Sequence, residues 1–399
     1  MPHSCRKWVS RMPEVHAVLG ASSAHRWMNC PGSVALNANA PDKSSTYADE
    51  GTLAHSLAEN MINYNLGRMT KREFNKVFDT IKKNELYSQE MQDYIEGYVN
   101  TIWELMNEAK KTTPDAELLT EQRLDFSRYV PDGFGTGDVV IVCDGFVHVI
   151  DLKYGKGVGV SAEENPQLML YGLGALAAYD LLYGIKTVKM TIIQPRLDIV
   201  SSYEVYAEDL EEWGENTVRP KAEAALLPDA PCSAGSWCQF CKVKATCRAR
   251  AEANLELARF EFQDPRLLSD EEIGGILKRA GEVAAWASDV KAYAQTEAVE
   301  HGKKWDGWKL VEGKSNRKYT DELAVAKALT TAGYDEAVLY ERKLLGITAM
   351  EKLVGKKNFT ELLGELVVKP AGAPTLVEAT DKRPEINSAE SAKEDFKDE

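Results

Sequence analysis

Two aspartates and a lysine near the middle of the chain are the residues whose types and spacing could do chemistry. Asp138, Asp151 and Lys153 lie in the stretch GTGDVVIVCDGFVHVIDLKYG, residues 135–155. Carboxylate oxygens suit Mg²⁺ or Mn²⁺, and Mg²⁺ typically uses one or two carboxylates together with substrate phosphate. A nearby lysine can orient an attacking water or help to deprotonate it while the cation acts as a Lewis acid. These residue types indicate metal-assisted hydrolysis of a phosphate ester.

This chemistry requires the three side chains to meet, and the turn between them predicts that they do. Asp144-Gly145 is typical of a two-residue hairpin, a type I′ turn with positive φ at both positions. Counting outward from that turn places Asp138 opposite Asp151, and Lys153 shares the face of Asp151 because side chains alternate along a strand. Opposed carboxylates repel each other unless a cation or proton lies between them. The alternative is that Asp138 caps its strand while Asp151 and Lys153 form a surface ion pair.

Three further polar side chains could belong to the same site. Gln167 and Tyr171 are four residues apart on an expected helix and therefore share one side of it. His55, in EGTLAHSLAE, is expected on a helix shortly after Gly51. Each of these residues alone is common in helices, so the functional interpretation depends on the order in which all the motifs occur along the chain.

In that order, the motifs resemble those of RecB-family nucleases: a helical histidine after glycine, an aspartate that opens a strand, D-x-K at the end of the next strand, and Q-x3-Y on the following helix. The resemblance implies a PD-(D/E)xK restriction-endonuclease-like core, an α/β fold with a mixed central sheet flanked by helices. It also implies a catalytic set and a metal-ligand set. The catalytic set is His55, Asp138, Asp151, Lys153, Gln167 and Tyr171; the ligands are His55, Asp138, Asp151 and the backbone carbonyl of Leu152.

Four of the seven cysteines fall close together, which indicates a metal centre rather than a disulfide framework. Cys238, Cys241 and Cys247 form C-x2-C-x5-C, and a fourth ligand is needed for tetrahedral zinc or a four-iron cluster. A local zinc module would use Cys232. RecB-like nucleases of the AddB type, and their CRISPR-associated relatives, hold a [4Fe–4S] cluster with one cysteine before the core and three after it. Resemblance to that layout implies Cys30 and a cluster; Zn²⁺ is the alternative.

Two basic stretches are candidates for DNA contact. Lys242, Lys244 and Arg248 interleave with the cysteines and could hold phosphate. In residues 303–319, lysines alternate with aromatic residues, among them Trp305 and Trp308, a combination that suits stacking on single-stranded bases. For this second stretch the interpretation we favour is a tryptophan-anchored β-hairpin with solvated lysines.

The elements that must position these residues can be read from changes of period. Three- and four-residue spacing predicts two helices before the site, and apolar stretches predict four strands around it. The expected helices are 44–66, 88–110 and 165–179, the last opened by Asn165 and Pro166; the expected strands are 117–126, 136–143, 146–153 and 187–194. This order predicts an α/β sheet that mixes antiparallel and parallel pairing.

The remaining parts of the chain complete the domain organisation. We expect residues 1–15 to be a disordered extension, 16–251 the nuclease core with its cysteines, 252–368 a mainly helical region, and 369–399 a flexible acidic tail. Several segments of these regions resemble a phage and prophage family related to the CRISPR-associated RecB-like nucleases. These segments are SSAHRWMNCPGS, WCQFCKVKATCRARAE, GWKLVEGKSNRKY and PTLVEATDKRPEI.

Composition is consistent with an ordinary globular protein that does not adhere broadly to nucleic acid. The formal net charge is −14, so any DNA contact is expected to be local. No apolar run is long enough to span a bilayer, the N-terminus does not read as a secretory signal, and we expect a location in the bacterial host cytosol.

The function expected from these observations is a Mg²⁺- or Mn²⁺-dependent deoxyribonuclease, an exonuclease in phage DNA replication or recombination. DNA is the expected partner, together with phage single-strand-binding or recombination proteins. Two alternatives are a catalytically silent DNA-binding scaffold and a zinc-ribbon nucleic-acid-binding module on an α/β domain.

Overall fold

The computed structural model describes residues 17–41, 46–256, 269–311, 321–332, 339, 347–363 and 366–367. The chain divides into two compact units, Met1–Thr296 and Glu297–Glu399. The extension and the tail expected from the sequence lie outside the described residues. The boundary expected after residue 251 falls inside helix α9, Arg248–Leu255.

The first unit is built on a five-stranded mixed sheet with strand order β1-β2-β3-β4-β5. The strands are β1 (Glu117–Asp125), β2 (Phe134–Cys143), β3 (Phe146–Leu152), β4 (Thr187–Gln194) and β5 (Ile199–Tyr206). β3 and β4 run parallel, and the other three neighbouring pairs are antiparallel. The prediction of a mixed α/β sheet is confirmed; β5 was not predicted.

The central hairpin has the predicted register but not the predicted turn type. β2 and β3 pair from Cys143 with Phe146 to Val139 with Ile150. Gly145 has φ 74°, whereas Asp144 is not among the described residues with positive φ, so the type I′ turn is wrong. The backbone N–H of Gly145 donates to the carbonyl of Tyr183 at 2.7 Å, so the turn takes its shape against the end of a neighbouring helix as well as from its own sequence.

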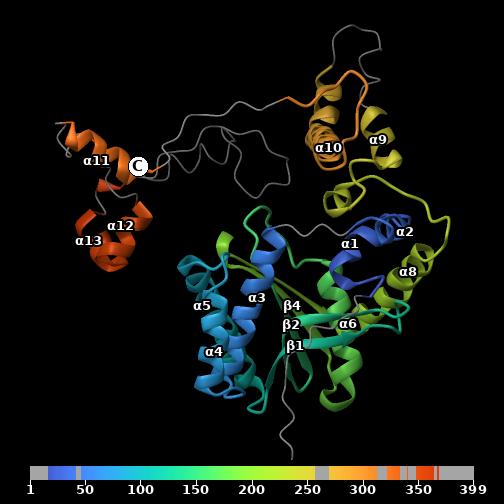
Figure 1. The fold of residues 1–399 in the computed structure, drawn as a ribbon. Helices are drawn as coiled ribbons and strands as arrows, with labels where there is room; N and C mark the ends of the chain where they lie inside the picture. The colour runs from blue at the N-terminus through green and yellow to red at the C-terminus, as the bar shows by residue number, and fades with distance from the viewer. Residues whose placement is uncertain are drawn as a thin grey trace, which may run out of the picture. The chain divides into compact units, whose positions relative to one another are not determined.

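Helices cover both faces of this sheet (Figure 1). Helices α3 (Thr46–Asn65), α4 (Lys71–Lys82) and α5 (Gln89–Thr112) lie on one face, and α6 (Pro166–Tyr183) lies on the other. Alternate residues of β2 belong to two hydrophobic cores, one on each face of the sheet. Val139 and Ile141 pack with α3 and α5, while Val140 and Val142 pack with α6. The alternation explains why β2 reads as a continuous apolar run, since both of its faces are buried.

Local signals set the ends of the helices that matter for the site. Asn165 caps α6 by accepting hydrogen bonds from the backbone N–H groups of Gln167 and Leu168, and Pro166 is the first helical residue, as predicted. The helix extends beyond the expected Tyr179 and ends at Gly184, which adopts the left-handed conformation. Ser88 caps α5 in the same way.

Shorter elements complete the first unit. They are η1 (Ala21–Ser23), α1 (Ala24–Trp27), α2 (Ser33–Ala38), η2 (Pro195–Leu197), α7 (Ala207–Trp213), the π-helix η3 (Gly214–Val218), α8 (Arg219–Ala225), η4 (Ser236–Phe240) and α9. α10 (Asp270–His301) runs across the boundary between the two units. Of the region 252–368 that we expect to be mainly helical, the end of α9 and all of α10 are helical, and residues 257–268 lie outside the described part.

The second unit contains helices α11 (Glu322–Thr331), α12 (Ile347–Val354) and α13 (Lys356–Leu363). Residues 302–311 form turns and irregular backbone without a strand, so the β-hairpin favoured for 303–319 is not formed in that part; residues 312–320 lie outside the described residues. Among the described helices, none combines the length and apolar character needed to cross a membrane.

Candidate active site and cysteine pocket

The six residues expected in the active site form two hydrogen-bonded groups at the end of the β2–β3 hairpin: His55 with Asp138, and Asp151 with Lys153, Gln167 and Tyr171. Asp138 lies in the middle of β2, Asp151 near the end of β3, and Lys153 directly after β3. α3 supplies one histidine from one side of the sheet, and α6 supplies a glutamine and a tyrosine from the other. The β2–β3 pairing ends at Val139 with Ile150, so Asp138 and Asp151 lie directly beyond its last pair.

His55 and Asp138 form a partly buried pair. His55 Nδ1 lies 3.1 Å from Asp138 Oδ1, and the backbone N–H of Leu152 donates to Asp138 Oδ2 at 2.7 Å. Burial works against the protonated imidazole, but the adjacent Asp138 carboxylate outweighs it and raises the pKa of His55 to about 9. Burial likewise opposes the charged form of Asp138, yet His55 and the Leu152 N–H hold the pKa of Asp138 below its usual value.

Gln167 connects the other aspartate to the lysine. Lys153 Nζ lies 3.0 Å from Asp151 Oδ2 and donates to Gln167 Oε1 at 3.0 Å. The amide of Gln167 donates to Asp151 Oδ1 at 2.9 Å and to the Tyr171 hydroxyl at 3.4 Å. A side chain at Gly135 would collide with the Tyr171 ring, because an added Cβ would lie 2.5 Å from its Cε1. Glycine at position 135 therefore permits the close approach of α6 to β2.

Lys153 offsets part of the negative charge that the two aspartates bring into the buried site. Burial and the nearby Asp138 carboxylate raise the pKa of Asp151, although Lys153 opposes this. Burial disfavours the charged form of Lys153, but the two aspartates raise its pKa above the usual value. A divalent cation would relieve this repulsion, as the sequence predicts for opposed carboxylates.

Glu121 is a candidate ligand that sequence reasoning missed. Ligand atoms of His55, Glu121 and Asp138 all lie within 4.8 Å of one another, and Leu152 lines the same pocket. Desolvation by the surrounding protein, together with the charges of Asp138 and Glu59, raises the pKa of Glu121 to about 7. Its φ of 48° interrupts the regular strand conformation. A glutamate in a predicted strand cannot be recognised as a metal ligand from the sequence, because its place in the site depends on how β1 pairs with β2.

The donor set fits a hard divalent cation. Two carboxylates and an imidazole offer oxygen and nitrogen atoms of the kind that Mg²⁺ and Mn²⁺ accept. The hydroxyl of Tyr98, a residue that lines the same pocket, is buried and has no hydrogen-bond partner among the described residues.

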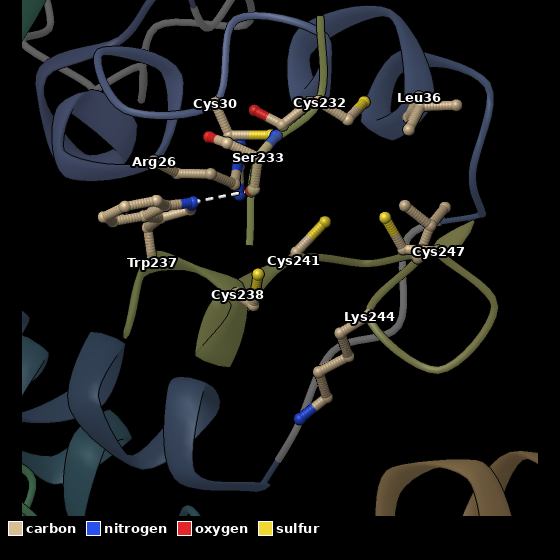
Figure 2. Close-up of a pocket in the computed structure, with 12 residues that line it drawn as sticks. Arg26, Cys30, Leu36, Cys232, Ser233, Trp237, Cys238, Cys241, Lys244 and Cys247 are labelled. Atoms are coloured by element: carbon tan, nitrogen blue, oxygen red, sulfur yellow. Dashed lines mark hydrogen bonds between the residues drawn. The ribbon is translucent and has the colours of Figure 1, made fainter. Parts of the chain in front are cut away.

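Five cysteines line a second pocket, formed by segments from before and after the sheet (Figure 2). Both candidates for the fourth ligand are present, so proximity does not choose between Cys30 and Cys232. The sulfur of Cys30 accepts a hydrogen bond from the Ser233 N–H at 3.3 Å, and that of Cys241 accepts one from the Asn37 amide at 3.2 Å. The other lining cysteines are Cys238 and Cys247.

Cationic and polar groups make this pocket suitable for a group of thiolates. Arg26 and Lys244 line it. Arg26 Nε and the hydroxyl of Ser33, which also lines the pocket, are buried without a hydrogen-bond partner among the described residues. Thiolates are the ligands of iron–sulfur clusters and of structural zinc, and the donors around them would stabilise their charge.

The match of a protein-family model decides the family. The model for DUF2800, described as "Protein of unknown function (DUF2800)", matches residues 16–384. The chain belongs to the DUF2800 family. A solved structure described as "Crystal structure of SSO0001" is similar at 17% identity, with a TM-score of 0.25, over 60% of this chain and 90% of that chain.

In this DUF2800 member the basic stretch beside the cysteines is partly neutralised. Lys244 and Arg250 both pair with Asp289, at 2.9 and 2.6 Å, and the backbone N–H of Lys242 donates to the Asn37 side chain at 2.8 Å. Arg248 is largely exposed and lies 3.9 Å from Glu252. Of the basic residues expected to hold phosphate, Lys244 is therefore already paired with a carboxylate.

The aromatic candidates for DNA contact belong to the second unit of this DUF2800 chain. Lys303 Nζ lies 4.3 Å above the Trp305 ring, a cation–π contact within the stretch. Trp308 is 78% exposed, so its ring is accessible for stacking.

Proposed function

We propose that this protein is a Mg²⁺- or Mn²⁺-dependent DNA nuclease with a RecB-like PD-(D/E)xK core, encoded by a phage or prophage. One observation carries the proposal: two buried polar groups, His55 with Asp138 and Asp151 with Lys153 and Gln167, meet at the end of the central hairpin. The backbone N–H of Leu152, the residue after Asp151, donates to Asp138 and holds the two groups side by side. A surface ion pair would not need this arrangement, since Asp151 is only 4% exposed.

The residues of these groups have separable roles. His55, Glu121 and Asp138 would hold the cation, with Asp151 and the Leu152 carbonyl as the further ligands that the family resemblance implies. The cation would polarise the phosphate and promote ionisation of the attacking water. Lys153 would orient that water and stabilise charge on the phosphate. Gln167 fixes Lys153 and Asp151 relative to each other through its two hydrogen bonds.

By the same resemblance we propose action on DNA ends, as an exonuclease in phage replication or recombination. Single-strand-binding or recombination proteins of the phage would be its partners. Lys242, Arg248 and the exposed Trp308 are the proposed contacts with DNA outside the active site.

The cysteine pocket supports a second part of the proposal, a [4Fe–4S] cluster that braces the fold. Cys30, Cys238, Cys241 and Cys247 would be its ligands. The observation that favours Cys30 is the hydrogen bond that its sulfur accepts from the Ser233 N–H. Zinc held with Cys232 is the competing assignment.

The nuclease proposal is tested by digesting end-labelled DNA with anaerobically purified full-length protein in Mg²⁺ or Mn²⁺. Asp151→Asn keeps the size of the side chain but removes its charge, and we expect cleavage to fall by about 100-fold or more. The matched control is Asp144→Asn, at the exposed turn of the same hairpin, which should cut normally.

Binding measured beside cleavage separates the alternatives. Asp151→Asn should still bind DNA in EDTA, because the proposed DNA contacts lie elsewhere. Unchanged cleavage in Asp151→Asn would remove the mechanism. Wild-type protein that binds DNA but cuts neither single- nor double-stranded substrates with either cation would support the catalytically silent scaffold.

A further inference from the structure

The hydroxyl of Tyr98 is a buried polar group that the mechanism above does not use. Tyr98 lies on α5, is 2% exposed, and its oxygen has no hydrogen-bond partner among the described residues. Buried polar groups in native proteins are nearly always hydrogen-bonded, and an unsatisfied one costs about 1–3 kcal/mol. A phenylalanine would fill the same core position without that cost, so the hydroxyl calls for a partner.

The surroundings of this hydroxyl indicate what the partner is. Tyr98 lines the pocket that also holds His55, Glu121 and Asp138, the group whose ligand atoms lie within 4.8 Å of one another. Two half-buried tryptophans, Trp103 and Trp286, also have buried N–H groups without a partner among the described residues, but they do not line this pocket. Tyr98 therefore combines an unsatisfied hydroxyl with a position beside the candidate cation ligands.

The chemistry of hydrated cations supplies a suitable partner. Mg²⁺ and Mn²⁺ bound by only two or three protein groups keep several waters, and these waters are strong hydrogen-bond donors. A tyrosine hydroxyl is protonated at neutral pH and can accept one hydrogen bond while donating another. A water accompanying the cation can therefore donate a hydrogen bond to the Tyr98 hydroxyl.

Resting on the proposed cation site, we infer that Tyr98 is a positioning residue. Its hydroxyl accepts a hydrogen bond from a water of the hydrated divalent cation held by His55, Glu121 and Asp138. This role orders the water around the cation and increases the affinity for it. Partners of this kind around a metal typically change affinity about 10–100-fold.

The test is Tyr98→Phe in full-length protein, titrated with Mn²⁺ by calorimetry. We expect the Kd for Mn²⁺ to rise about 10-fold. We also expect thermal stability in EDTA to stay equal or increase, because the lost hydroxyl had no partner in the metal-free protein. The matched control is Tyr94→Phe, one turn earlier on α5 and partly buried in the same core, which should bind Mn²⁺ like the wild type.

The outcomes separate this inference from the nuclease proposal. Wild-type protein that binds no Mn²⁺ would refute the cation site itself and, with it, the role of Tyr98. Wild-type binding that Tyr98→Phe leaves unchanged would overturn the inference on Tyr98 alone. A marked loss of stability in EDTA would also overturn it, since the hydroxyl would then have a structural partner.

Discussion

At the scale of single residues, charge pairs link the side chains of the site. His55 lies 3.1 Å from Asp138, and its pKa of about 9 favours the protonated imidazole beside that carboxylate at neutral pH. A histidine that binds a metal must be neutral, so cation binding would release this proton. The pair would thus keep Asp138 charged and oriented when no cation is present.

This pairing predicts a pH dependence of stability in EDTA. The pKa of His55 is about 9 in the folded protein against 6.5 when unfolded, so folding favours the protonated form. Its contribution is complete below about pH 6.5 and disappears as the pH rises through 9. We expect His55→Gln to cost on the order of 2 kcal/mol at pH 6 and much less at pH 9.5, measured by urea unfolding.

The control for that measurement is His25→Gln, an exposed histidine on α1 that forms no ion pair in the described structure. Its effect should be small at every pH. A cost of His55→Gln that did not decrease with pH would mean that the imidazole is not charged beside Asp138.

At the scale of secondary-structure elements, the sequence predicted what is local. The Asp144-Gly145 turn fixed the register of the central hairpin, and the Asn165-Pro166 cap fixed the start of α6. Helix α4 was missed although Thr70 and Glu73 form a capping box, a readable signal. β5 was also missed, and all of its residues are exposed or only partly buried.

The sequence did not predict which distant elements meet. Glu121 belongs to β1 and Tyr98 to the buried face of α5, and neither has a characteristic spacing from the D-x-K motif. Their place in the site depends on strand register and helix docking, which single-sequence periodicity does not specify. Residues that belong to the sequence motifs of the resembled family were therefore predicted, whereas residues that reach the site only through tertiary contacts were not.

The docking of α6 gives a prediction at this scale. A Cβ at Gly174 would lie 2.8 Å from Leu124 Cβ and 3.1 Å from the backbone nitrogen of Asp125, so α6 touches the backbone of β1. We expect Gly174→Ala to push α6 outward and destabilise the protein by about 1–3 kcal/mol. Since α6 carries Gln167 and Tyr171, cleavage should also decrease.

Gly97 provides the matched control for that substitution. It lies within α5, and an added Cβ would meet nothing within 4 Å. Gly97→Ala should stabilise the protein by about 0.5–1 kcal/mol, because alanine favours the helix. Denaturant unfolding of both variants measures the contrast; equal effects would mean that the tight α6–β1 contact is not maintained.

At the scale of the whole first unit, the cysteine pocket joins segments that are far apart in sequence. The N–H of Gly32 donates to the carbonyl of Pro231 at 2.9 Å, and the Asn37 side chain bonds to both Cys241 and Lys242. A metal centre ligated by Cys30 would close a very long loop between these segments. Such a closure stabilises mainly by restricting the unfolded chain.

This arrangement predicts different consequences for the two candidate ligands. After anaerobic purification, wild-type protein should be brown with about four irons per chain. Cys30→Ser should lose that iron and about 3–5 kcal/mol of stability, as expected when a covalent tie across a long loop is broken. Cys232→Ser should keep both, because the hydrogen-bonded sulfur of Cys30 remains to complete the ligand set. If Cys232→Ser loses the metal while Cys30→Ser keeps it, the metal centre is a local module. Colourless, zinc-loaded wild-type protein would rule out the iron–sulfur assignment but not the nuclease proposal.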